Sequence, residues 1–362
     1  MQHEDGNALS SLSLVREEID RIDHEILSLL SKRGGLALKA RDFKEALNLP
    51  LYDPNREQAI LERLIGLNQG PFSDDALKDV FREVVRVCRS LEQPFHVAFL
   101  GPPASFTHNA SLDRFGPSGL YEPMGTIEEV FEAVEHRRVD VGVVPIENSI
   151  EGGVTATLDK LAYTEACVIE ERILPVELAL LGCDTDLGSI REVYSHPQAL
   201  GQCRQWLLKN LPGASMVPAE STAKASMLVK DRKGTAAVAS KLAAKLYGLK
   251  VIEDRIEDVP FNQTRFFVIA MNMGPRTGRD KTSALVRIKD EPGALFAMLS
   301  PFSARGINLS KIESRPSRFE PFSYVFFLDF YGHALDPNVE EAIAEVRSLA
   351  LWFKVLGSYP KA

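Results

Sequence analysis

The chain has 362 residues, of which 45% are hydrophobic and 25% charged, and its formal net charge is −8. These fractions are those of a soluble globular protein, and the length suggests two or three domains. The negative charge argues against nucleic acid or an anionic membrane as a partner. The polar, acidic start MQHEDGNALS predicts no signal peptide, and no apolar run is long enough to span a bilayer.

The first block, residues 1–93, reads as helices. Its first helix has apolar residues at spacings of three and four, the stripe of a helix that packs on other helices: Leu12, Val15, Ile19, Ile22, Ile26 and Leu29. Asp53-Pro54 and Ser73-Asp74 are typical starts of two further helices. Because three helices in about 80 residues form a thin core, this block is expected to need a partner chain.

The middle block, residues 94–274, alternates short apolar runs with helical stretches. The runs are 97–100, 139–144, 193–195, 235–239 and 266–270. This order predicts an α/β domain with a mostly parallel sheet. Ligands of such domains bind in the crevice beyond the carboxyl ends of the strands.

The last block, residues 275–362, follows a loop that carries Gly274, Pro275 and Gly278. It predicts strand 283–288, helix 293–304, strands 308–315 and 324–330, helix 337–349 and strand 353–359. The order βαββαβ is the ferredoxin-like arrangement.

Four stretches of the middle block combine a strand end or helix start with hydroxyl, amide or charged residues: LGPPASFTH (100–108), VVPIENS (143–149), YSHPQALGQC (194–203) and NQTRF (262–266). Two helix starts around a crevice suit a small carboxylate, because free N–H groups and the positive end of the helix dipole face it. The sequence has no metal-ligand cluster, Walker loop or Rossmann glycine fingerprint, so no metal and no cofactor is expected. The scattered Cys88, Cys167, Cys183 and Cys203 predict reduced thiols and a cytoplasmic location.

Residues 95–272 resemble the prephenate dehydratase family at GPPASFTH, VVPIENS, YSHPQ, EST (220–222) and NQTRF. The resemblance implies conversion of prephenate to phenylpyruvate with loss of CO₂ and water, in a two-lobed α/β domain like the periplasmic binding proteins. It implies that Thr264 is catalytic and that Asn148, Ser195 and Gln202 line the site. Glu147, Arg265, Ser105 and Thr107 are expected to bind substrate, and Arg265 would bind a carboxylate or orient Thr264.

Taken singly, each of these motifs has a structural interpretation. A threonine at a strand start is usually a β-former, Ser195 before His196-Pro197 is typical of a helix cap, and IENS could be a turn that Asn148 stabilises. Their occurrence together favours the functional interpretation.

Residues 13–92 are similar to the all-helical chorismate mutases. The matching positions are Arg16, Arg33, Lys44, Asp53, Arg56 and Glu57, and Cys88 and Glu92 stand where relatives often have a hydroxyl residue and a glutamine. The resemblance implies that Arg33, Lys44 and Glu92 are catalytic and that the others bind substrate. The rearrangement needs no acid, base or cofactor, so cations that select the folded substrate are expected.

Helix geometry adds a prediction about assembly. On one continuous helix Arg16 and Arg33 lie about 25 Å apart, so a small dianion cannot touch both from one chain. If both serve a site, Arg16 reaches into the partner's site, which predicts an intertwined homodimer, or a tetramer built from it. Gly34-Gly35 inside this helix costs about 1 kcal/mol per glycine relative to alanine.

EPGALF (291–296) and NLSKIESRP (308–316) resemble the phenylalanine-binding signatures of ACT domains. The resemblance implies an L-phenylalanine site and feedback inhibition, with Phe296 where the family has valine. The expected effector residues are Gly293, Ala294, Leu295, Phe296, Asn308, Leu309, Glu313, Ser314, Arg315 and Pro316.

Together the three resemblances predict a bifunctional enzyme of phenylalanine biosynthesis that acts on chorismate and prephenate. Two alternatives stay open at this point. One is a monofunctional prephenate or arogenate dehydratase with a non-catalytic helical module, and the other is a non-catalytic amino-acid sensor.

Overall fold

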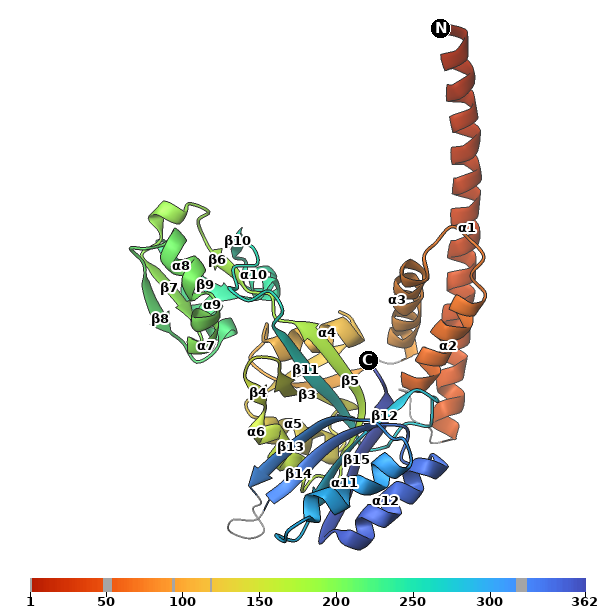
Figure 1. Cartoon of the computed structure of the whole chain (residues 1–362). Coiled ribbons are helices and arrows are strands. Elements are labelled where there is room, and N and C mark those ends of the chain that lie inside the picture. Colours follow the sequence, from red (N-terminus) through yellow and green to blue (C-terminus); the bar gives the residue numbers. More distant parts are fainter. Residues whose placement is uncertain (1, 48–53, 93–94, 118, 317–323) are drawn as a thin grey trace. The chain divides into compact units, whose positions relative to one another are not determined.

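The computed structural model describes residues 2–47, 54–92, 95–117, 119–316 and 324–362 (Figure 1). The chain forms two compact units, Met1–Pro94 and Phe95–Ala362.

The first unit consists of helices, as predicted. Helices α1 (Gln2–Ala46) and α2 (Pro54–Gly66) both pack against α3 (Asp74–Glu92). Helix α1 continues through Gly34-Gly35, and a Cβ atom on the buried Gly34 would lie 3.0 Å from the Leu91 side chain. Gly34 therefore lets α3 approach α1 closely, which accounts for a residue that is otherwise unfavourable inside a helix.

The second unit begins with a lobe built on one mixed sheet. Its strands are β1 (His96–Leu100), β2 (Leu120–Met124), β3 (Val141–Asn148), β4 (Gly152–Gly153), β5 (Cys167–Pro175) and β11 (Gln263–Ala270). The order is β2-β1-β3-β11-β5, with β4 paired to β3. The helices are α4 (Phe106–Phe115), α5 (Ile127–Glu135) and α6 (Thr155–Leu161).

A second lobe is inserted between β5 and β11. Its sheet has the order β10-β6-β9-β7-β8, with strands β6 (Ala179–Gly182), β7 (Glu192–Ser195), β8 (Ser215–Pro218), β9 (Thr235–Ala239) and β10 (Lys250–Glu253). Its helices are the short 3₁₀ turn η1 (Leu187–Ser189), α7 (Pro197–Gln202), α8 (Arg204–Asn210), α9 (Thr222–Val229) and α10 (Lys241–Tyr247). The two lobes confirm the two-lobed α/β prediction.

The prediction of a mostly parallel sheet is wrong. Strand β11 runs antiparallel to both of its neighbours, β3 and β5, and β6 runs antiparallel to β9 and β10. The reason is the insertion: the chain leaves the first lobe after β5 and returns from the second lobe as β11, which enters between two strands already in place. The periodicity of a strand gives no information on its direction.

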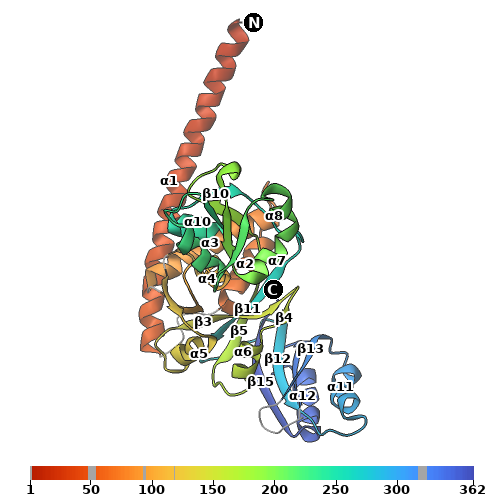
Figure 2. The ribbon, with the colours of Figure 1, turned by 90° about the vertical axis from the view of Figure 1, so that its left-hand side faces the viewer.

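The C-terminal part of the second unit has the predicted βαββαβ order. It contains β12 (Asp280–Arg287), α11 (Ala294–Ala304), β13 (Leu309–Pro316), β14 (Tyr324–Tyr331), α12 (Pro337–Leu349) and β15 (Trp352–Pro360). The sheet order β13-β14-β12-β15 is ferredoxin-like, and α11 and α12 pack side by side (Figure 2). Strand β13 is an edge strand of this sheet.

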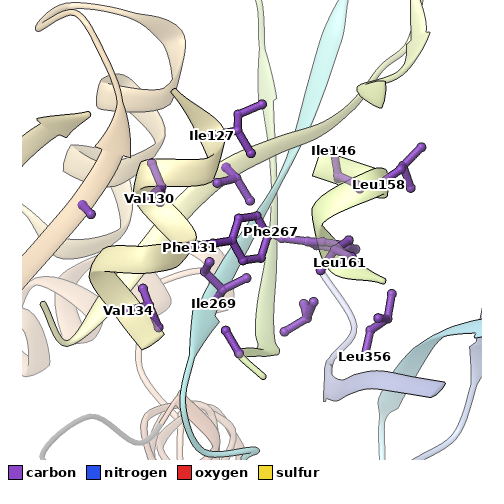
Figure 3. Close-up of a cluster of buried hydrophobic side chains, with 14 of the residues drawn as sticks. Ile127, Val130, Phe131, Val134, Ile146, Leu158, Leu161, Phe267, Ile269 and Leu356 are labelled. Carbon is purple, nitrogen blue, oxygen red and sulfur yellow. The ribbon is translucent and has the colours of Figure 1, made fainter. Parts of the chain in front are cut away.

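The first lobe and the C-terminal part share one hydrophobic core. Figure 3 shows members of this core: Phe267 of β11, Phe131 of α5, Leu161 of α6 and Leu356 of β15. A Cβ atom on Gly357 would lie 2.0 Å from the Val168 carbonyl oxygen, so only glycine lets β15 approach β5 this closely. The predicted linker around Gly274 thus connects two parts that pack tightly together.

Candidate functional site

The pairing of β11 with β3 builds the centre of the candidate dehydratase site. Thr264 lies opposite Asn148 in the strand register, and Asn148 Nδ2 donates to Thr264 Oγ1 over 2.9 Å. Asn148 Oδ1 accepts from the backbone N–H groups of Ile150 and Glu151, at 3.0 and 3.1 Å. Backbone N–H groups can only donate, so they fix which end of the Asn148 amide faces Thr264. Thr264 Oγ1 is therefore an acceptor toward Asn148, and its own proton can point to a substrate.

One residue of this centre was missed by the sequence analysis. Asn262, only 3% exposed, accepts from Asn148 Nδ2 over 2.8 Å and donates to Gln202 Oε1 over 3.2 Å. It joins Asn148 of the first lobe to Gln202 at the end of α7 in the second lobe. Its place in the NQTRF stretch was a signal, but only the fold brings Gln202 beside it.

Ser195 and Ser105, two other predicted hydroxyl residues of the dehydratase, have structural partners. Ser195, fully buried at the end of β7, donates to the Val238 carbonyl over 2.6 Å. Ser105 caps α4: it donates to the Leu100 carbonyl over 2.8 Å and accepts from His108 N–H over 3.2 Å. Thr107 is 4% exposed inside α4.

The loop before α4 also joins the two lobes. Tyr247 and Ser240 of the second lobe donate to the carbonyl oxygens of Pro103 and Ala104, at 2.7 and 3.3 Å. Ala104 has the left-handed φ of 68°, and its N–H donates to His108 Nδ1 over 3.0 Å. His108 thus holds an unfavourable backbone conformation at a contact between the lobes.

Arg265 lies away from Thr264 because successive side chains of a strand alternate between its two faces. Its guanidinium contacts Glu171 at 2.7 Å, Asp329 at 2.5 Å and the Tyr359 hydroxyl at 3.0 Å. Burial alone would lower the pKa of Arg265, but Tyr359, Asp329 and Glu171 outweigh it and raise that pKa, so the cation persists. Asp329 and Tyr359 bind Arg265 to the ferredoxin-like part, while Glu171 belongs to β5 of the first lobe. The contact of Arg265 with a substrate carboxylate or with Thr264 stays a prediction.

Glu147 also points to the C-terminal part. Its carboxylate lies 2.8 Å from Lys311 Nζ, which in turn lies 3.1 Å from Glu313. Glu147 is the neighbour of Asn148, and Glu313 is one of the expected effector residues. Ion pairs therefore connect β13 to Glu147, the residue next to the candidate dehydratase centre. The substrate contact expected for Glu147 stays a prediction.

The predicted mutase residues lie along α1, α2 and α3. Arg33 Nη1 reaches the Val84 carbonyl of α3 at 3.5 Å, Cys88 is 6% exposed, and Glu57 pairs with Arg89 at 2.6 Å. Arg89, 8% exposed, is a buried cation that the sequence analysis missed.

The remaining mutase predictions differ in what the structure describes. Arg16 and Arg56 are exposed, and Lys44 is half-buried. Asp53 and the side chain of Glu92 lie outside the described residues.

The predicted effector residues occupy two elements of the ferredoxin-like part. Gly293, with φ of 85°, caps α11, and Ala294, Leu295 and Phe296 follow in its first turn. Phe296 is 78% exposed. Asn308 precedes the edge strand β13, which carries Leu309, Glu313, Ser314, Arg315 and Pro316. An exposed apolar residue and an open strand edge are features of a surface that pairs with another chain.

The described residues contain neither a metal-binding cluster nor a membrane-spanning helix. No group of three or more histidine, cysteine, aspartate or glutamate side chains there could hold a metal ion. None of the helices in those ranges is long and apolar enough to cross a membrane.

Three family models match the chain: "Chorismate mutase type II" at residues 15–93, "Prephenate dehydratase" at 97–274 and "ACT domain" at 282–348. A bifunctional chorismate mutase/prephenate dehydratase of Aquifex aeolicus is 46% identical over 98% of this chain and 99% of its own. One of Stutzerimonas stutzeri is 41% identical over 97% and 98%. A prephenate dehydratase of Arthrobacter aurescens, solved in complex with L-Phe, is 37% identical with a TM-score of 0.68, covering 74% of this chain and 90% of that chain.

These matches extend over both units and over nearly the full length of the bifunctional relatives. The chain therefore belongs to the family of bifunctional chorismate mutase/prephenate dehydratases with an ACT domain, enzymes of phenylalanine biosynthesis.

Proposed function

We propose that Thr264, Asn148 and Gln202 form the dehydratase site of this bifunctional enzyme. The observation that carries the proposal is the bond from Asn148 Nδ2 to Thr264 Oγ1, which leaves the threonine proton to a substrate. The Thr264 hydroxyl donates a hydrogen bond to the ring hydroxyl of prephenate, which departs as hydroxide and becomes water by taking up a proton from the solvent. The ring carboxylate leaves as CO₂, and its bonding electrons complete the aromatic ring of phenylpyruvate.

The neutral character of the cluster suits this elimination. Thr264, Asn148, Asn262 and Gln202 carry no charge, and Arg265 lies on the other face of β11. A cation against the departing carboxylate would stabilise it before it leaves, which would raise the barrier. Because aromatisation supplies the driving force, the protein contributes mainly positioned hydrogen bonds.

We propose further that Arg16, Arg33, Lys44 and Arg56 bind the two carboxylates of chorismate for its rearrangement to prephenate. Helix α1 is continuous, so Arg16 and Arg33 lie about 25 Å apart on it and cannot serve one site of one chain. The exposed apolar side chains of α1, among them Val15 at 56%, Ile19 at 51% and Ile26 at 48%, support a homodimer in which these helices pair. Asp53, Glu57, Cys88 and Glu92 stay assigned to the same site.

The third part of the proposal is regulation by L-phenylalanine in residues 275–362. The exposed α11 start and the open edge of β13 supply its binding surface when two chains pair. The relative solved with L-Phe supports this choice of effector. Residues 1–93 and 94–274 then act as the mutase and the dehydratase, and four unbridged cysteines are compatible with the cytoplasm.

The test is phenylpyruvate formation by the purified chain from chorismate alone, with and without L-phenylalanine. Production that L-phenylalanine suppresses is expected. Thr264→Val should leave prephenate production from chorismate unchanged and cut dehydratase kcat by about a hundredfold, since one transition-state donor is lost. Full dehydratase activity of this variant would contradict the proposed site. Conversion of prephenate but not of chorismate would favour the monofunctional alternative, and no conversion of either would favour the sensor.

A further inference from the structure

The amide of Asn262 has its two ends bonded to two different lobes. Its Oδ1 accepts from Asn148 Nδ2 and its Nδ2 donates to Gln202 Oε1. Because Asn148 is oriented by two backbone N–H groups, Asn262 must present its oxygen to Asn148 and its nitrogen to Gln202. The orientation set at Asn148 is thereby passed on to Gln202.

The consequence for Gln202 is a defined donor. Its Oε1 is taken by Asn262, and no described residue accepts from its Nε2. If the amide turned over, Nε2 and Asn262 Nδ2 would face each other as two donors. Asn262 therefore selects the orientation in which Gln202 Nε2 can donate to a ligand.

Backbone hydrogen bonds hold Asn262 in the position from which it orients the Gln202 amide. Its carbonyl accepts from Val176 N–H over 2.8 Å, so the two segments that connect the lobes are bonded to each other at this residue. The carboxylate of Asp258, on the same segment, accepts hydrogen bonds from the backbone N–H groups of Gln205 and Trp206 at 2.9 and 3.1 Å. These bonds hold the segment against the start of α8.

We propose that Asn262 is a positioning residue of the dehydratase: its side-chain amide orients Gln202 so that Gln202 Nε2 donates to the substrate. Such a donor suits the carboxylate or the hydroxyl oxygens of prephenate. The role rests on the proposed function, because it acts through Gln202 and Asn148.

Asn262→Asp is the decisive variant, because its hydrogen-bond pattern changes with protonation. The protonated acid keeps both bonds: its O–H donates to Gln202 Oε1 and its C=O accepts from Asn148. The ionised acid only accepts, so the Gln202 amide turns to it and loses its donor to the substrate. Asn262→Leu removes both bonds at every pH.

Dehydratase kcat/KM is to be measured on the full chain with prephenate from about pH 5.5 to about pH 9, with the uncatalysed rate subtracted. Asn262→Asp is expected to lose at least about tenfold at the alkaline end and to recover toward the acidic end, with a titration that the wild type lacks. Asn262→Leu should stay low throughout. Mutase activity of the same preparations, which uses the other unit, should not change.

Other ionisable groups lie near Asn262, and they are the same in the wild type and in both Asn262 variants. Glu257 accepts from Leu178 N–H over 3.0 Å, Asp258 is bonded as described, and Glu147 pairs with Lys311. Burial, and then Glu257 and Asp258, raise the pKa of Cys203, so this thiol stays protonated over the range. Gln263→Glu, at the exposed neighbouring position, controls for an added negative charge and should keep the wild-type profile.

The outcomes separate this inference from the proposed function. If Asn262→Leu and Asn262→Asp keep wild-type kcat/KM while Thr264→Val is inactive, Asn262 has no positioning role and the proposed site stands. If Thr264→Val is active, the proposed site itself is refuted. If the pH profile of kcat/KM for Asn262→Asp matches that for Gln263→Glu, the effect comes from the added negative charge alone, and the inference is overturned. The melting temperature of Asn262→Asp, measured over the same pH range, separates recovered positioning from a recovered fold.

Discussion

His108 connects backbone conformation, aromatic packing and protonation at one residue. Its ring stacks on Phe99 with centroids 4.5 Å apart and meets the edge of Tyr121 at 5.6 Å. Its Nδ1 must stay unprotonated to accept from Ala104 N–H. Burial lowers the pKa of His108 in the folded chain. The pKa of His108 is therefore higher in the unfolded chain, at about 6.5, than in the folded one.

This difference makes the stability of the second unit dependent on pH. The contribution of His108 is fully present above the unfolded pKa and is lost as the pH falls below about 6.5, because there the unfolded state binds more protons. His108→Asn keeps an acceptor for Ala104 N–H but cannot titrate. We expect it to lower the melting temperature at neutral pH, through the lost ring contacts, and to flatten the fall of melting temperature toward acidic pH.

Differential scanning calorimetry of the full chain between about pH 5 and about pH 8 checks this expectation. His136→Asn, at an exposed position on the same lobe, is the matched control and should keep the wild-type slope. Equal slopes for both variants would assign the pH dependence to other groups.

The Thr264-Arg265 pair illustrates what a sequence gives at the scale of residues. The motif located both residues, and the alternation of side chains along a strand already implied that they face opposite sides. The motif could not show which residues contact Arg265 on its face of the strand. Its partners Asp329 and Tyr359 lie on strands that come 64 and 94 residues later in the chain. Gln202 and Asn262 were likewise both in recognised stretches, but their contact depends on how the inserted lobe folds back.

At the scale of elements, the strands of the ferredoxin-like part were predicted to within three residues at each end. Strand β13 alternates half-buried and exposed positions along its length, which is a strong periodic signal. Periodicity did not predict the pairing of β11, because the inserted lobe decides the direction of this strand and its neighbours in the sheet. The contact between β13 and β3 could not be predicted either, because Lys311 and Glu147 lie far apart in the chain and only the fold brings them together.

That contact gives a prediction about regulation. Lys311 of β13 bridges Glu313 and Glu147, and Glu147 precedes Asn148. If L-phenylalanine on the β13 surface favours a less active state, this bridge is a direct connection to the dehydratase centre. Lys311→Met should raise the L-phenylalanine concentration for half-inhibition by about tenfold or more, while activity without effector stays within about twofold of wild type.

Dehydratase inhibition curves, together with calorimetric titration of L-phenylalanine, check this prediction. Retained binding with weakened inhibition is the expected pattern, because the variant removes coupling and leaves the binding surface. Lys289→Met, at an exposed position of the same part, is the control and should be inhibited like wild type. Wild-type inhibition of Lys311→Met would exclude the bridge as the connection.

At the scale of the whole molecule, helix α1 exposes apolar side chains in a single chain. Its apolar stripe was predicted from the spacing of residues, and in one chain Leu12, Val15 and Leu29 are 45%, 56% and 65% exposed. A second copy of the same helix is the simplest cover for a stripe of this length, since closed symmetric pairs are the commonest oligomers. The proposed mutase site requires the same pairing, because it takes Arg16 from one chain and Arg33 from the other.

Mixing two inactive variants tests this shared site directly. In a heterodimer of Arg16→Ala and Arg33→Ala chains, one site receives the intact Arg33 of the first chain and the intact Arg16 of the second, and the other site lacks both. Random pairing makes about half of the dimers mixed, with one good site in two, so about a quarter of wild-type mutase activity should return. The measurement is prephenate formation from chorismate after the two chains are co-expressed or refolded together.

Arg33→Ala mixed with Lys44→Ala is the matched control. These two residues lie in the same half of α1, so a shared site takes both from the same chain and every site in the mixture keeps one defect. No activity should return in this mixture. No recovery with Arg16→Ala would mean that each chain builds its mutase site alone, and the exposed stripe of α1 would then need another partner. Recovery in the control would mean that Arg33 and Lys44 of one site come from different chains, which would contradict the proposed division of the site.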